Sequence, residues 1–148
     1  MNDDHISQDL ANQLLKMEKV RENDTEYDFP SLGGELRVVL FSVDQKEEFF
    51  LDIRRSFINL SRTKYQSRAR KNIILLRLDI NGGPHRNPDG QEVGSPHVHI
   101  YREGYNDKWA YELPKEFKNI NDPWETLLDF YRYCNITKPP IIRKGLFT

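Results

Sequence analysis

The chain has 148 residues, of which 37% are hydrophobic, 11% aromatic and 30% charged, and its 22 basic and 23 acidic residues give a net charge of −1. This length suits one domain over residues 1–148, with extended or flexible ends expected at 1–5 and 137–148. No apolar run approaches the roughly 18 residues of a membrane-spanning helix, and the acidic start lacks the pattern of a secretory signal, so we expect a cytoplasmic protein without a membrane partner. The single cysteine, Cys134, excludes an internal disulfide and a cysteine-rich zinc site.

The first predicted element is a helix that begins after Ser7 and ends near Val20. Ser7 is a good N-cap residue, and Asp9 favours the positive end of the helix. Apolar residues recur at helical spacing, namely Ile6, Leu10, Leu14 and Met17. A loop is expected to follow and to end at the glycine pair Gly33 and Gly34.

Strands are predicted over 36–43, 48–54, 73–80, 95–102 and 108–113, where branched or alternating apolar residues dominate. The segment 56–71 is ambiguous, with a short strand near Phe57–Leu60 and then a basic turn or helical turn. A second helix is expected after Asp122 and Pro123, which form a cap and a first-turn proline. This order predicts an α+β fold, with a mainly antiparallel sheet of four to five strands and an N-terminal and a C-terminal helix packed on one face.

Charge is strongly segregated along the chain. Residues 1–29 hold eight acids and three bases, whereas residues 53–78 hold eight bases and no acid. The basic segment predicts a surface for RNA or another polyanion, although a solvated surface or packing against the acidic part would give the same pattern. Either Tyr65 or Phe57 could stack on bases. The candidate nucleic-acid-binding residues are Arg54, Arg55, Arg62, Lys64, Tyr65, Arg68, Arg70 and Lys71.

Side-chain alternation places a group of reactive residues on one face of two strands. If Ile74, Leu76, Leu78 and Ile80 face the core, Arg77 and Asp79 face outward. The same reasoning for the strand around Val98 and Ile100 turns three side chains outward, those of His97, His99 and Tyr101. If the two strands are neighbours, these groups lie close together, and the loop 81–94 adds His85. The candidate catalytic residues are therefore His97, His99, Arg77, His85, Tyr101 and Asp79.

Three chemistries fit these residues. In metal-free RNA cleavage, one histidine takes the proton of a 2′-hydroxyl, a second protonates the leaving oxygen, and Arg77 stabilises the phosphate. In a metal site, His97 and His99 with Glu103 resemble part of the first cupin motif, but the expected preceding glycine and later histidine are missing. The segment SPHVHIY also resembles the histidine-triad family of nucleotide transferases, with Tyr101 in place of the third histidine. We expect no cofactor for the first of these, and a divalent metal stays open.

Most of the chain, from the first helix to Leu113, resembles a group of uncharacterised short bacterial proteins that share a domain of unknown function. The most distinctive block is RLDINGGPHRNPDGQEVGSPHVHIYREGYNDKWA, residues 77–110. The PHVH…EG segment is similar to one in small proteins of toxin–antitoxin operons. The family resemblance implies a bacterial or mobile-element origin, and the similarity of this segment favours a role in bacterial conflict, such as a toxin–antitoxin system or phage defence.

Together these features predict an RNA-cleaving or other phosphodiester-acting protein that works through His97 and His99. The alternative is a non-catalytic inhibitor or adaptor that binds a protein partner, such as an antitoxin or a target complex, or a nucleic acid through the basic segment. The third choice is the cupin-like metal site. Substitution of the histidines would abolish function in an RNA-cleaving protein, whereas charge reversal in the basic segment would abolish it in an inhibitor or adaptor.

Overall fold

The computed structural model describes residues 5–59 and 61–145, which contain two helices and twelve strands. The helices are α1 (Gln8–Lys16) and α2 (Pro123–Tyr133). The longer strands are β3 (Glu35–Ser42), β4 (Glu48–Arg55), β5 (Thr63–Ala69), β6 (Ile73–Ile80) and β9 (His97–Ile100). The short strands are β1 (Lys19–Arg21), β2 (Glu26–Asp28), β7 (His85–Arg86), β8 (Glu92–Val93), β10 (Ala110–Glu112), β11 (Ile136–Lys138) and β12 (Ile141–Arg143).

Eight strands form one mixed sheet in the order β10-β9-β6-β5-β4-β3-β1-β11. Strand β1 pairs with β11 in parallel, whereas the other neighbours are antiparallel. The expectation of four to five antiparallel strands is therefore wrong. The short strands β1 and β11, which the sequence did not predict, have three residues each, too few to show an alternation of apolar and polar residues. The strands β11 and β12 also extend the ordered chain beyond residue 136.

The strand β5 lies in the centre of this sheet, where the sequence suggests a basic turn or helical turn. Its core-facing residues are Thr63, Tyr65, Ser67 and Ala69, all buried. Only one of these is a large apolar side chain, so the alternation is invisible to a hydrophobicity pattern. The expected strand near residues 57–60 is absent over 57–59, which form a loop, and Leu60 lies outside the described residues.

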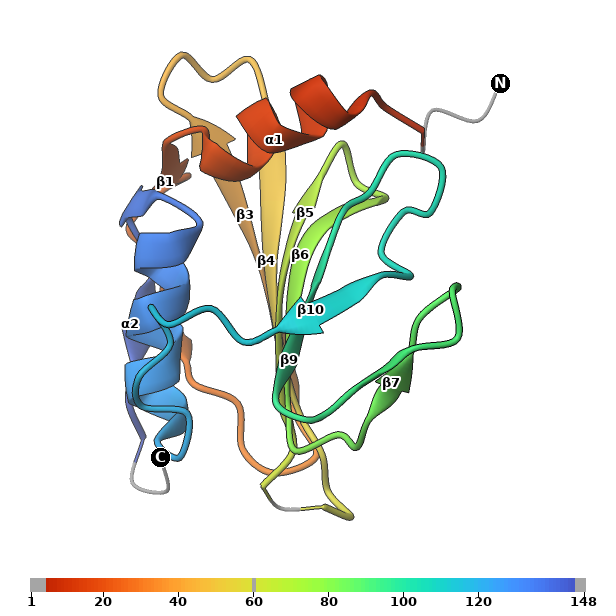
Figure 1. Ribbon diagram of the computed structural model, residues 1–148. Coiled ribbons are helices and arrows are strands. Elements are labelled where there is room, and N and C mark those ends of the chain that lie inside the picture. Colours follow the sequence, from red (N-terminus) through yellow and green to blue (C-terminus); the bar gives the residue numbers. More distant parts are fainter. Residues whose placement is uncertain (1–4, 60, 146–148) are drawn as a thin grey trace.

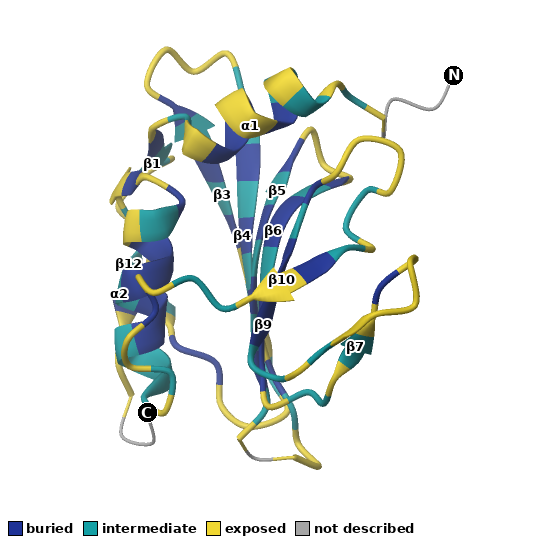
Figure 2. Ribbon diagram, in the orientation of Figure 1, coloured by how far each residue is buried: buried dark blue, intermediate teal, exposed yellow. Residues whose placement is uncertain are grey.

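Both helices contribute to one core on one side of the sheet. Leu14 of α1 and Leu127 of α2 join the same buried cluster as Leu51, Leu76 and Leu78 from the central strands. Figure 1 shows α2 on one side of the sheet and β7 on the other, and Figure 2 shows the buried part of α2 facing the sheet. Neither helix of the described residues therefore covers the opposite face of β3–β6.

Both helix N-caps are the residues that the sequence predicts. Ser7 accepts a hydrogen bond from the Leu10 N–H, and Asp122 accepts from the first turn of α2, as predicted. Helix α1 ends at Lys16 rather than near Val20, because residues 19–21 pair with β3 and β11 as strand β1. Cys134 is the C-cap of α2 and is fully buried.

Neither helix of the described chain has the length and apolar character needed to cross a lipid bilayer.

Candidate functional site

Polar side chains run in rows across the face of the sheet that the helices leave uncovered. Residues directly opposite one another on adjacent strands have Cβ atoms about 5 Å apart, so each row forms a continuous surface. The basic residues of β4 and β5 thereby adjoin the histidines of β9. The two rows are Arg54–Lys64–Asp79–His97 and Asp52–Gln66–Arg77–His99.

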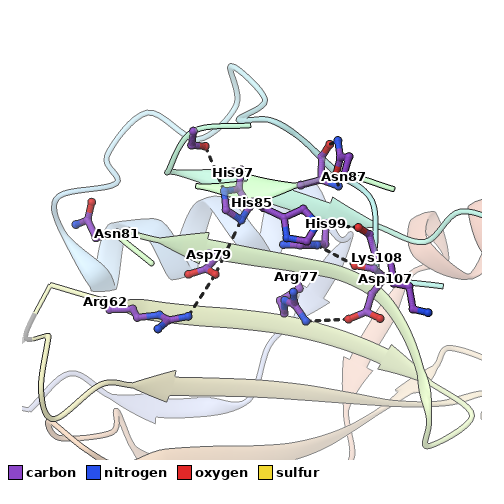
Figure 3. A network of polar contacts seen from close by, with 12 residues as sticks. Arg62, Arg77, Asp79, Asn81, His85, Asn87, His97, His99, Asp107 and Lys108 are labelled. Atoms are coloured by element: carbon purple, nitrogen blue, oxygen red, sulfur yellow. Dashed lines mark hydrogen bonds and ion pairs between the residues drawn. The ribbon is translucent and has the colours of Figure 1, made fainter. Parts of the chain in front are cut away.

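The two strands that carry the predicted reactive residues are neighbours, which is the condition on which the predicted cluster depended. Asp79 lies opposite His97, and Arg77 lies opposite His99. His85 of the β7–β8 hairpin joins them, with its ring centroid 4.6 Å from that of His99 and 6.0 Å from that of His97. The rings of His97 and His99 are 5.0 Å apart. Figure 3 shows the three imidazoles gathered beside Arg77 and Asp79.

The β7–β8 hairpin lies against this histidine cluster. The sequence predicted that these side chains face solvent, but the hairpin buries them. The exposed fractions of His97 and His99 are only 2% and 1%, and His85 is half-buried. Each ring also faces a backbone carbonyl, and the nitrogen at that carbonyl must carry the proton because a carbonyl only accepts. His97 Nδ1 donates to the Gly94 carbonyl at 3.2 Å, His99 Nδ1 to the Asp107 carbonyl at 2.8 Å, and His85 Nε2 to the Lys108 carbonyl at 2.8 Å.

Burial keeps the two strand histidines neutral. It lowers the pKa of His97 and, together with the guanidinium of Arg77, lowers the pKa of His99 to about 3. A general acid must hold a proton near neutral pH, and His99 does not. The pair is therefore poorly suited to the acid and base roles that the sequence suggested.

Asp79 is the buried carboxylate between the histidines and the basic surface. Its Oδ2 lies 3.8 Å from Arg62 Nη2 and 4.0 Å from His97 Nε2. Its Oδ1 has no hydrogen-bond partner among the described residues. The Gly82 backbone passes so close that a Cβ there would overlap Asp79 Oδ1 and lie 2.9 Å from Arg62 Nε. A side chain at Gly82 would thus push the Asp79–Arg62 pair apart.

Two predicted members of the cluster lie elsewhere. Strand β9 ends at Ile100, so the alternation does not extend to Tyr101. Tyr101 is buried beside α1, where its hydroxyl accepts from the Ile6 N–H and donates to the Ile6 carbonyl. Glu103 accepts from the Gln8 N–H at 2.7 Å. The predicted metal set of His97, His99 and Glu103 is therefore not assembled, and residues 5–59 and 61–145 contain no group of three or more His, Cys, Asp or Glu side chains placed to hold a metal ion.

Asn87 fixes the hairpin over the histidines. It is buried, its Nδ2 donates to the Ala110 carbonyl at 2.9 Å, and its Oδ1 accepts from the Ala110 N–H at 2.7 Å. These two hydrogen bonds pair the Ala110 N–H and carbonyl at the outer edge of β10, as a neighbouring strand would. In the sequence, Asn87 begins the turn motif NPDG (residues 87–90), which predicts a loop but not where that loop packs.

Replacing Asn87 with alanine should lower the free energy of unfolding by about 3 kcal/mol, because it leaves a buried N–H and carbonyl of Ala110 without partners. Asp89→Ala in the same hairpin is the matched control, since Asp89 is exposed and, within the part of the chain that the structure describes, accepts from the Gln91 N–H alone. Urea unfolding measures the difference, and amide exchange at Ala110 locates it. Equal stability of the two variants would show that the Asn87 bonds do not hold the hairpin.

The predicted nucleic-acid-binding residues do not form a single surface. Tyr65 is fully buried, with its hydroxyl donating to the Pro123 carbonyl, so it cannot stack on a base. Arg55 is also buried and donates to the Pro30 carbonyl. Arg68 is tied to Asp52 at 2.6 Å. Arg70 and Lys71 occupy the turn between β5 and β6, at the opposite end of β5 from Arg62 and Lys64.

The remaining basic residues line two adjoining pockets. The sheet pocket, of about 300 Å³, is lined by Glu35, Leu36, Arg37, Asp52, Ile53, Arg54, Lys64, Gln66 and Arg77. The loop pocket, of about 430 Å³, is lined by Gly33, Arg54, Arg55, Ser56, Phe57, Ile58, Arg62 and Lys64. Arg54 and Lys64 belong to both, so the two pockets adjoin at this pair, and we call the two together the groove. Arg37, Gln66 and Ile58 were missed in the sequence, since side chains of these types are common on any surface.

The charged residues that line the loop pocket are all cationic, which favours an anion there, whereas the sheet pocket also has the carboxylates of Glu35 and Asp52. Partial burial lowers the pKa of Lys64, and the guanidiniums of Arg62, Arg77 and Arg54 lower it further, against the carboxylate of Asp79. Neither Arg54 nor Lys64 has a side-chain hydrogen bond or ion pair within the described ranges. Clustered cations without partners bind phosphate groups well.

Comparison with known proteins adds a family and no function. No curated protein and no solved structure matches the chain. The model of a family of unknown function, DUF6978, matches residues 6–136. Because this match covers most of the chain, the protein belongs to the DUF6978 family.

Proposed function

We propose that the protein binds the phosphate backbone of a nucleic acid in the groove formed by the loop pocket and the sheet pocket. The observation that carries the proposal is the lining of the loop pocket, which has four cationic side chains and, among the described residues, no carboxylate. Its volume of about 430 Å³ lies within the range of small-ligand sites. Phosphate contacts supply most of the affinity in non-specific nucleic-acid binding.

The proposal takes the binding alternative in preference to RNA cleavage by His97 and His99. Both rings are buried, and the lowered pKa of each leaves it neutral at pH 7. The histidine cluster instead supports the fold beside the groove, through bonds to three backbone carbonyls. A role of this binding in a toxin–antitoxin system or in phage defence is supported only by the resemblance of the PHVH…EG segment.

The test is a titration of a short fluorescein-labelled oligouridine, followed by fluorescence anisotropy at low salt. Charge reversal of both shared residues, Arg54→Glu with Lys64→Glu, should weaken binding about 100-fold, because two charged contacts at about 1.5 kcal/mol each are lost. The matched control is Lys46→Glu with Lys138→Glu, which makes the same charge change at exposed sites outside the groove. Affinity of the control should stay within about twofold of the wild type.

Equal weakening by both double variants would reduce the effect to net charge and contradict a defined groove. The same titration with the deoxy oligonucleotide decides between RNA and DNA. A denaturing gel of the same samples tests cleavage, and we expect intact RNA. If the wild type cleaves RNA and His97→Ala does not, the histidine pair is catalytic and the binding proposal is wrong.

A further inference from the structure

Two large apolar side chains are exposed at the rim of the loop pocket. The exposed fraction is 74% for Phe57 and 95% for Ile58, the highest among the exposed large hydrophobic residues of the described chain. Both line a pocket whose other side chains are mainly cationic. An aromatic ring beside clustered cations is the arrangement that single-strand-binding proteins use, with the ring for bases and the cations for phosphates.

The Phe57 ring is backed by the main chain at Gly33. A Cβ at Gly33 would lie 3.1 Å from Phe57 Cβ and 3.2 Å from Phe57 Cδ2, so the missing side chain lets the ring approach the backbone. Gly33 has φ +79°, a conformation that favours glycine. Its N–H donates to the Arg55 carbonyl at 3.1 Å, which ties this backbone to the end of β4. The ring therefore has a fixed support and remains largely open to solvent.

The cations that could hold the adjoining phosphate lie next to this ring. Arg54 and Lys64 are direct cross-strand partners, with Cβ atoms about 5 Å apart. They form the boundary between the loop pocket and the sheet pocket. A strand with one base against Phe57 and the next phosphate between Arg54 and Lys64 would continue into the sheet pocket. There the Gln66 Nε2 donates to Asp52 Oδ2 at 2.9 Å, and the Gln66 amide oxygen could accept from a base.

We propose that Phe57 is a stacking platform for an unpaired nucleobase, so that the ligand of the groove is a single-stranded nucleic acid. This inference rests on the proposed function and names its substrate class. In a duplex each base is already covered by its neighbours, so only a flexible single strand can present a base to the ring.

The experiment compares two ligands, the labelled oligouridine and heparin, which has the negative charge but no bases. Phe57→Ala should weaken oligouridine binding about tenfold and leave heparin binding and the salt dependence unchanged, because it removes stacking and no charge. Phe57→Trp should restore the affinity. Val43→Ala is the matched control, since Val43 is 62% exposed at a site outside both pockets, and it should change neither affinity.

The two levels of the proposal fail separately. If Phe57→Ala binds oligouridine as the wild type does while the Arg54→Glu, Lys64→Glu variant loses binding, the stacking platform is wrong and the phosphate-binding groove stands. If Phe57→Ala also weakens heparin binding tenfold, the residue acts through the shape of the loop, and the inference is again wrong. If none of these variants changes oligouridine binding, the groove itself is wrong.

Discussion

Replacing Lys19 with methionine is expected to lower the free energy of unfolding by about 4 kcal/mol. The ammonium of Lys19 is fully buried and donates to three carbonyls near the ends of the two helices, Leu15 at 2.8 Å, Met17 at 2.9 Å and Cys134 at 2.8 Å. Burial lowers the pKa of Lys19 to about 8, which still leaves it protonated at pH 7. Methionine keeps the packing over the Phe49 ring but cannot donate, so three buried carbonyls lose their partner.

Lys16→Met is the matched control for this substitution. Lys16 is exposed, and among the described residues its Nζ donates to the Tyr133 carbonyl at 3.2 Å and lies 4.1 Å from the centroid of the Tyr133 ring. Its loss should therefore lower the free energy of unfolding by no more than about 1 kcal/mol. Denaturant unfolding of both variants gives the comparison. Identical midpoints would show that the buried ammonium does not join the two helix ends.

Acid should destabilise the protein through His99 before the carboxylates titrate. The pKa of His99 is about 3 in the fold, against 6.5 for an ordinary histidine, so the unfolded chain takes up the proton first as the pH falls. The stabilising contribution is complete above about pH 6.5 and is lost as the pH falls toward 3, at about 1.4 kcal/mol per pH unit. The lowered pKa of His97 acts in the same direction.

His99→Asn should reduce this pH dependence. An asparagine amide can still donate to the Asp107 carbonyl, but it does not titrate. Urea unfolding between pH 6.5 and 4.5 should show the wild type losing about 2 kcal/mol more than this variant. His5→Asn, at an exposed histidine, should retain the wild-type slope. An unchanged slope in His99→Asn would mean that His99 is protonated in the folded protein.

The neighbourhood of Arg77, Asp79, His97 and His99 could be predicted because β6 and β9 carry clear apolar alternation. The burial of the histidines could not, since it depends on the β7–β8 hairpin. Its strands have two residues each, and the side-chain bonds of Asn87 to β10 leave no periodic trace in the sequence.

Local irregularities explain two further errors. In the pairing of β5 with β6, Arg68 lies opposite Ile74 and Ser67 opposite Leu76, so Leu75 has no partner in β5. Beyond this bulge Ile74 is only half-buried, although even positions were expected to face the core, and Leu75 is buried instead. The end of β9 at Ile100 similarly places Tyr101 beside α1.

The groove could be predicted only in part. Of the residues in the basic segment, Arg54, Arg62 and Lys64 lie together at one end of β4 and β5. The segment could not indicate that Arg68 is neutralised by Asp52, because this contact depends on the register of β4 against β5. Nor could it show which side of β5 Tyr65 faces, since that strand was not recognised.

Chemical-shift mapping of the isotope-labelled wild type during titration with oligouridine tests the groove most directly. We predict that the largest amide shifts fall on residues 33–37, 54–58 and 62–66, with little change on α1, α2 or the turn at Arg70 and Lys71. Shifts confined to the helices, to that turn or to the β7–β8 hairpin would contradict binding on the uncovered face of the sheet.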